Sequence, residues 1–235
     1  MLEYASPVWG SIISDSNFNK LQTVQNAALR TATGCHQMAP IQHLHVESKT
    51  IPVKSHIEMK NAQFLIECQD NDHTSYTITR PKFQDRPNRK QTLQEKYGNR
   101  ITNFDFLDTK RGRKLANNKI HTDTVKMELE KNQERIRLNG WPPLGTDLNI
   151  NQEELTLPRL ARCRLSQLRS GYCSQLNSYR NRIDPTIENK CPDCKKTPHD
   201  VPHLFKCKKN PTTLTTSDLW RQPAKVAKWL NLVKS

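Results

Sequence analysis

Apolar residues recur at helical spacing through the first part of the chain. Residues 16–33 are predicted to form a helix, which Asp15 or Ser16 can cap by accepting from free backbone N–H groups. A second apolar stripe follows Pro52, whose missing N–H suits a first helical turn. We therefore expect residues 1–70 to form a small helical unit. The stripes consist of Phe18, Leu21, Val24, Ala28 and Leu29, and of Val53, Ile57, Phe64, Leu65 and Cys68.

The middle of the chain lacks such a pattern. From Asp70 to about Gly112, prolines and charged residues follow one another without a period, which is typical of a flexible linker. A short polar helix is predicted over 118–137, and the glycines and prolines of 139–148 indicate a turn-rich loop. We expect residues 71–156 to form a basic, disordered linker that contains one short helix.

Helical periodicity returns at Leu157, and Pro158 suits the first turn of the helix that follows. Gly171 interrupts the apolar stripe of this helix and is expected to kink it or split it in two. A last helix is predicted to begin at Pro223. The fold is thus expected to be mainly α, with residues 157–235 as a C-terminal module. The stripes are Ala161, Leu165, Leu168, Tyr172, Leu176 and Tyr179, and then Val226, Trp229, Leu230 and Val233.

The composition favours small packed units over one large core. Of the 235 residues only 34% are hydrophobic, and the mean hydropathy is −0.83. The sequence has no apolar run of the roughly 18 residues that a membrane span needs. Because the N-terminus lacks a basic stretch followed by an apolar one, we expect an intracellular protein of the nucleus or cytoplasm.

The net charge of +14 is concentrated in two blocks. Residues 80–121 carry twelve basic and four acidic side chains, and residues 159–209 carry the same numbers, so each block has a charge of +8. Clustered Lys and Arg favour a polyanion, because each one that neutralises a phosphate releases counterions; a merely soluble surface is the alternative. We expect RNA or DNA as the partner, bound with little sequence preference, and no small-molecule substrate. The candidates for phosphate contact are Arg159, Arg162, Arg164, Arg169, Arg180, Arg182, Lys190, Lys195, Lys196, Lys208 and Lys209.

Three of the seven cysteines lie within seventeen residues, together with two histidines. Two residues separate Cys191 from Cys194, a spacing that places both thiolates on one side of a tight turn and suits a tetrahedral ion. His203 and Cys207 share a face if the residues between them are helical, which gives the pattern C-x2-C-x8-H-x3-C. His199 is the alternative ligand, but we prefer His203 because a helical His–Cys pair is preorganised. We expect a structural Zn²⁺, since four protein ligands leave no position open for water.

Scattered blocks of the sequence are similar to one known family. They include 2–10 (LEYASPVWG), 165–173 (LSQLRSGYC) and the cysteine segment itself. In combination they resemble the C-terminal region of reverse transcriptases from non-LTR retrotransposons, near the jockey group. The resemblance implies a thumb-like unit over 1–70 within a truncated fragment of an RNA-directed DNA polymerase. Further blocks are 21–30, 33–35, 157–159, 179–183, 191–194, 203–207 and 219–220.

The chain departs from this family where catalysis would take place. The family's polymerase site holds metal ions with paired aspartates, and the sequence contains no Asp-Asp pair; Asp105 and Asp108 are read as loop residues. The family's endonuclease is also missing, and Met1 falls inside a family block, so we expect a fragment without enzymatic activity. The expected function is noncatalytic nucleic-acid binding. The alternatives are a zinc-stabilised protein-interaction module and a reading frame with no selected function.

Overall fold

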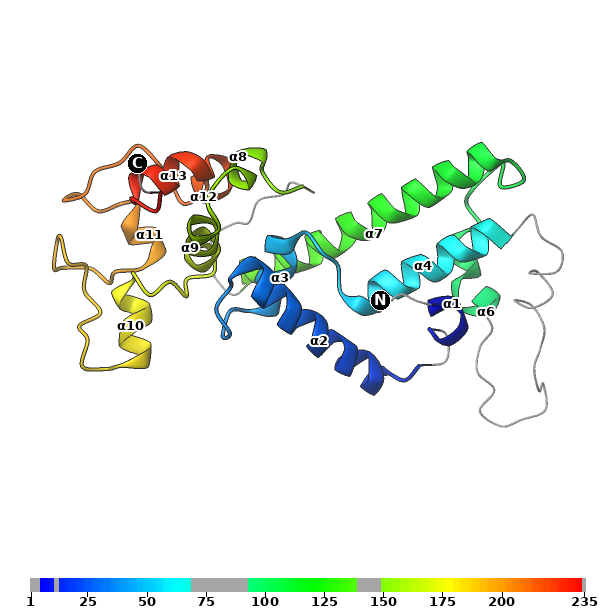
Figure 1. The fold of residues 1–235 in the computed structure, drawn as a ribbon, viewed down its shortest axis with the longest axis horizontal. Coiled ribbons are helices and arrows are strands. Elements are labelled where there is room, and N and C mark those ends of the chain that lie inside the picture. Colours follow the sequence, from blue (N-terminus) through cyan, green and yellow to red (C-terminus); the bar gives the residue numbers. More distant parts are fainter. Residues whose placement is uncertain (1–4, 11–12, 69–92, 139–148, 234–235) are drawn as a thin grey trace. The chain divides into compact units, whose positions relative to one another are not determined.

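The structure, a computed structural model, describes residues 5–10, 13–68, 93–138 and 149–233 (Figure 1). It is mainly helical, as the sequence predicted. These residues contain one isolated antiparallel bridge, between Lys190 and Pro198, and no strand. The predicted turn-rich loop over 139–148 and residues 71–92 of the expected linker lie outside the described residues.

The chain divides into two compact units, and each unit is built from two separate stretches. Unit 1 comprises Met1–Gln25 and Ile51–Glu128, and unit 2 comprises Asn26–Thr50 and Leu129–Ser235. This division differs from the three consecutive segments expected from the sequence. Residues 26–50, which the sequence assigned to the N-terminal unit, fold with the C-terminal half instead.

Side-chain bonds explain why residues 26–50 belong to unit 2. The thiol of Cys35 lies 2.8 Å from the Ser166 hydroxyl. The carboxylate of Glu47 accepts a 2.6 Å hydrogen bond from the guanidinium of Arg169. The C-terminal module expected from the sequence is therefore not self-contained, because its buried polar groups need partners from this earlier segment.

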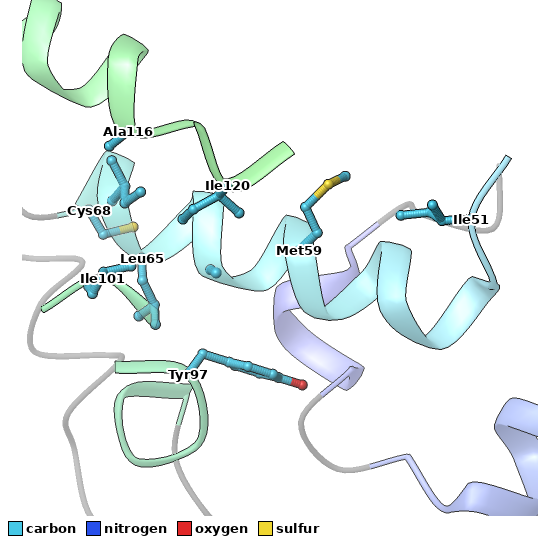
Figure 2. Close-up of a cluster of buried hydrophobic side chains, with 10 residues drawn as sticks. Ile51, Met59, Leu65, Cys68, Tyr97, Ile101, Ala116 and Ile120 are labelled. Carbon is cyan, nitrogen blue, oxygen red and sulfur yellow. The ribbon is translucent and has the colours of Figure 1, made fainter. Parts of the chain in front are cut away.

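Unit 1 is held together by apolar side chains from α4, from the segment around Tyr97 and from α7 (Figure 2). Pro52 immediately precedes α4, as predicted. The elements of the unit are α1 (Ser6–Trp9), the first part of α2 (Asp15–Thr33), α4 (Val53–Glu67), α6 (Leu93–Tyr97), the 3-10 helix η2 (Gly98–Arg100) and the first part of α7 (Lys110–Leu138). The buried cluster includes Met59, Ala62, Leu65, Ile66, Tyr97, Ile101, Ala116 and Ile120.

Part of the expected linker is ordered and helps to build this core, which corrects the prediction. Tyr97 and Ile101 are only 2% and 5% exposed, and α7 begins at Lys110 instead of residue 118 and has 29 residues. The reason is that a few apolar side chains suffice to order this segment when they pack against α4. They are spaced too widely along a polar stretch to give a recognisable period.

Unit 2 contains more and shorter helices. Gly171, with φ of +71°, splits the long helix predicted after Pro158 into α9 and α10. The N–H groups of Gly171 and Tyr172 donate to the carbonyls of Leu168 and Gln167, the pattern that ends a helix at a left-handed glycine. The elements are the end of α2, α3 (Ile41–Ser48), the end of α7, α8 (Gln152–Leu155), α9 (Arg159–Arg169), α10 (Asn177–Ile183), α11 (Val201–Leu204), α12 (Asp218–Arg221) and α13 (Pro223–Trp229).

A buried ion cluster of Arg169, Glu47 and Glu154 connects α9 with α3 and α8. Arg169 is 3% exposed and donates to both oxygens of Glu154, at 2.9 and 2.6 Å, and to Glu47 at 2.6 Å. Its guanidinium also donates to the Leu219 carbonyl and lies 4.2 Å from the centre of the Trp220 ring, so α12 packs on the same group. Every donor group of this guanidinium therefore has a partner inside unit 2.

Candidate metal centre

The first two cysteines of the predicted metal site lie in a small hairpin after α10. The bridge between Lys190 and Pro198 closes this hairpin, and the Cys191 N–H donates to the Thr197 carbonyl at 2.8 Å. Lys195 has φ of +54°, and its N–H donates to the Cys191 carbonyl at 2.9 Å. This left-handed residue turns the chain directly after Cys194, so both thiols lie on the same side of the turn.

The other two predicted ligands, His203 and Cys207, come from α11 and the turn that follows it. The side chain of Asp200 accepts a 2.8 Å hydrogen bond from the His203 N–H and so caps α11. The helix ends at Leu204, and the Lys206 N–H then donates to the His203 carbonyl in a tighter turn. The His203–Cys207 pair is therefore presented by one short turn of helix, less than the full helical span that the spacing suggested.

These four side chains converge on one point. Their ligand atoms all lie within 4.8 Å of one another. The sulfur atoms of Cys191 and Cys207 are 3.8 Å apart, and Cys194 Sγ lies 3.3 Å from His203 Nε2. Zinc–sulfur bonds of about 2.3 Å with tetrahedral angles hold two sulfur atoms roughly 3.8 Å apart. The group could therefore hold a metal ion.

His199 has a different role from the one considered for it as an alternative ligand. Its Nδ1 accepts a 3.2 Å hydrogen bond from the Asn177 N–H at the start of α10. Its backbone N–H donates to Asn189, and its carbonyl accepts from Ser178. Burial lowers the pKa of this imidazole, which favours the neutral acceptor form. His199 thus joins the hairpin to α10 and does not belong to the four-residue group.

The surroundings of Cys194 favour its thiolate. A hydrogen bond with the Thr197 hydroxyl, followed by backbone N–H groups of Lys196 and Thr197, lowers the pKa of Cys194 to about 5. Burial raises the pKa of Cys191 instead. Thiolates are the form in which cysteines bind metals. All seven cysteines of the chain are free, so none of the three cysteines in the group is engaged in a disulfide.

Most of the cations expected to contact phosphate are exposed around this hairpin and the segment after it. Residues 177–210 carry eight basic and four acidic side chains, a net charge of +4. Lys206, which the sequence reasoning missed, is exposed among them, and its position between two ligands could have identified it. We name these eight exposed side chains the metal-site basic surface: Arg180, Arg182, Lys190, Lys195, Lys196, Lys206, Lys208 and Lys209.

The arginines of α9 do not extend this surface as predicted. Arg169 was expected to contact phosphate, but it is buried with two carboxylates, so that prediction is wrong. Arg159 is exposed, yet it donates to the Thr31 carbonyl at the end of α2. Arg162 is half-buried, and Arg164 is half-buried and donates to the Ser174 hydroxyl at 2.7 Å.

Comparisons with protein-family models, curated proteins and solved structures gave no match for the chain. The similarity to reverse transcriptases therefore stays a prediction from the sequence blocks. Among the helices of the described segments, none combines the length and the apolar character that crossing a membrane requires.

Proposed function

We propose that the chain binds RNA or DNA without sequence preference and without catalysing a reaction, through the metal-site basic surface around a structural zinc ion. The observation that carries the proposal is that six exposed lysines lie next to Cys191, Cys194 and Cys207 in the sequence, and that these cysteines converge with His203. A metal held by these four residues would fix the hairpin and the turn after α11. The cations of both segments would then form one rigid surface.

Zinc is the ion that this ligand set fits best. Three thiolates and an imidazole are soft or borderline ligands, which select zinc over calcium or magnesium. Four protein ligands leave no position open for water or substrate, so the role of the ion would be structural. Three thiolates and Zn²⁺ together carry a charge of −1, which leaves the surrounding surface positive.

Phosphate is the partner group that the surface supports. Lys196 and Lys209 are exposed, and no ion pair or hydrogen bond between side chains holds them among the described residues. Such cations contact phosphates and contribute affinity without reading bases. If about five phosphates are neutralised, the logarithm of affinity falls with the logarithm of salt concentration at a slope of about −3.5 on single strands and about −4.5 on duplex DNA.

The sequence blocks support a place for this chain within a retrotransposon reverse transcriptase. The paired aspartates of such a polymerase are missing from its 235 residues. We therefore expect no nucleotide incorporation on a primed RNA template. Heat-sensitive incorporation by purified chain would contradict this part of the proposal.

The test is salt-dependent binding of a short labelled RNA to the full chain, measured by fluorescence anisotropy. Arg180, Lys196 and Lys209 come from three different segments of the metal-site basic surface and are changed together to Glu. The expected result is weaker binding and a slope flattened by about two, because three phosphate contacts are lost. None of the three is a metal ligand, so the metal content should not change.

A matched control carries the same charge change elsewhere in unit 2. Arg221, Lys225 and Lys228 are exposed on α12 and α13, which lie apart from α10 (Figure 1). Changing these three to Glu should alter the slope much less than the first variant does. Weak binding that is equal in both variants would favour the zinc-stabilised protein-interaction module instead.

A further inference from the structure

Phe106 is the most exposed large hydrophobic side chain among the described residues. It is 76% exposed, whereas Phe104, two residues earlier, packs against the core of unit 1. Phe106 also has φ of +59°, a left-handed conformation that bulky residues rarely adopt. An aromatic ring that is both exposed and held in an unfavourable backbone conformation calls for a functional explanation.

The backbone around Phe106 is fixed by the start of α7. The Phe106 carbonyl accepts hydrogen bonds from the N–H and the hydroxyl of Thr109, at 3.1 and 3.0 Å. Gly112 approaches so closely that a Cβ atom there would lie 2.0 Å from the Phe106 oxygen. The Thr109 hydroxyl also accepts from the Gly112 N–H. The ring is therefore displayed from a constrained turn.

An open groove of about 430 Å³ lies beside the ring. Along α7, Arg111, Leu115 and Lys119 line it at intervals of four residues, so they share one face of the helix. Ala116 also lines the groove. The same residue belongs to the core cluster of unit 1 (Figure 2), so the groove borders the packed part of the unit. We name this site the Phe106 groove.

The charge around the Phe106 groove is positive. Residues 100–119 carry six basic and two acidic side chains, a net charge of +4. Lys110, Arg111 and Lys114 are exposed, and no ion pair holds them among the described residues. Exposed apolar surface next to several cations matches a ligand that combines a flat apolar ring with negative charge. An unpaired nucleotide has both.

We propose that the Phe106 groove binds single-stranded nucleic acid by stacking one unpaired base on the Phe106 ring, while Lys110, Arg111 and Lys114 contact the neighbouring phosphates. Duplex nucleic acid fits the groove poorly, because its bases are already stacked inside the helix. The groove lies within unit 1 and uses none of the metal-site basic surface. The inference therefore stands independently of the function proposed above.

The test compares Phe106→Ala with the unchanged full chain by fluorescence anisotropy, using a short labelled polyuridine strand. Loss of one stacked base should weaken binding by about fivefold to a hundredfold. The slope of affinity against salt should stay the same, because phenylalanine carries no charge. Phe106→Trp should retain the affinity of the unchanged chain for polyuridine. A strand of abasic nucleotides should bind Phe106→Ala and the unchanged chain equally.

Leu160→Ala is the matched control, because Leu160 is 67% exposed and lies beside Arg159 in unit 2. It should leave binding of the strand unchanged. Wild-type affinity in Phe106→Ala would overturn the inference and point to a protein partner for the ring. Binding that survives charge reversal at Arg180, Lys196 and Lys209 but is lost in Phe106→Ala would support this site and contradict the function proposed above. A chain that binds no single strand would overturn this inference, and a chain that binds neither single strands nor duplex DNA would also contradict the function proposed above.

Discussion

Units 1 and 2 are both helical, but they are stabilised by different interactions. In unit 1, α4 buries Met59, Leu65 and Ile66 against α6 and α7, and the main cluster consists of apolar side chains. Unit 2 also has an apolar cluster, but it adds a buried ion cluster and a group of four side chains that could hold a metal ion. The difference teaches that a helical unit can combine an apolar core with buried charged groups from segments far apart in the sequence.

The segment between α10 and α12 shows why unit 2 needs these groups. Over this stretch the structure has one four-residue helix, α11, and one isolated bridge. Val201 and Phe205 pack into the apolar cluster of the unit, but most of the stretch has no helix or strand. A metal ion that joins the hairpin to the turn after α11 would supply the missing free energy.

The largest expected effect is therefore that of removing the metal. Apparent zinc binding to structural sites is worth on the order of 10 kcal/mol. Chelation, or Cys191→Ser in the full chain, should abolish the hydrogen-exchange protection of the segment 189–207. The amides of α4 in unit 1 should keep their protection. Hydrogen exchange with mass spectrometry measures both regions in one experiment.

Cys68→Ser is the control for this prediction. Cys68 is 6% exposed in the core of unit 1 and belongs to no metal group among the described residues. Its replacement should leave the exchange of segment 189–207 unchanged. If chelation removed hydrogen-exchange protection equally from units 1 and 2, the claim that only unit 2 depends on a metal ion would be wrong.

The next effect concerns the buried ion cluster. Arg169→Ala leaves Glu47 and Glu154 buried without their partner, so it should lower the free energy of unfolding by about 3–5 kcal/mol. Arg164→Ala removes hydrogen bonds of a half-buried arginine on the same helix and should cost about 1 kcal/mol. Urea denaturation followed by circular dichroism measures both. An equal loss of unfolding free energy in the two variants would show that the buried ion cluster contributes no more to stability than the hydrogen bonds of Arg164.

The core of unit 1 should respond to lost volume alone. Leu65 is fully buried, so Leu65→Ala should lower the free energy of unfolding by about 2–5 kcal/mol. Metal content should stay at the wild-type level. Leu115→Ala, at a position that is 61% exposed, should change stability by no more than about 0.5 kcal/mol. Loss of metal in Leu65→Ala would mean that unit 2 depends on the core of unit 1.

Glu47→Gln is expected to change stability less than Arg169→Ala or Leu65→Ala. Arg169 keeps both hydrogen bonds to Glu154, so the change in the free energy of unfolding should be within about 1 kcal/mol at neutral pH. Burial raises the pKa of Glu47 above its ordinary value of 4.5, despite the nearby Arg169 and Lys49.

The sign of the pH dependence follows from this raised pKa. The folded state binds the proton of Glu47 more tightly than the unfolded state does, so this group contributes stability at low pH that is lost as pH rises. Wild type should therefore lose stability relative to Glu47→Gln between pH 4.5 and the raised pKa. Urea denaturation of both proteins at several pH values measures this difference in stability. A gain in the stability of wild type relative to Glu47→Gln as pH rises would contradict a raised pKa of Glu47.

Local patterns in the sequence predicted several helix starts well. The start of α2, the start of α4 after Pro52 and the last helix after Pro223 are confirmed, because apolar spacing and proline act over a few residues. Gly171 was expected to kink or split a helix, and it splits it. The grouping of His203 with the cysteines also agrees with the spacing argument.

Long-range contacts could not be predicted in this way. Nothing near residue 47 indicates that Glu47 pairs with Arg169, since 122 residues separate them. One local signal was available, however. Arg169 lies four residues after the buried Leu165, so it is on the same face of α9 as the apolar stripe. This position predicts a buried side chain and not a phosphate contact.

Metal content of the full chain tests the central claim most directly. After refolding with zinc, native mass spectrometry should find one zinc ion per chain in the wild type and in His199→Gln. Cys191→Ser and His203→Gln should carry none, because each loses one of four converging ligands. Wild-type chain without zinc, or zinc kept in His203→Gln but lost in His199→Gln, would contradict the account.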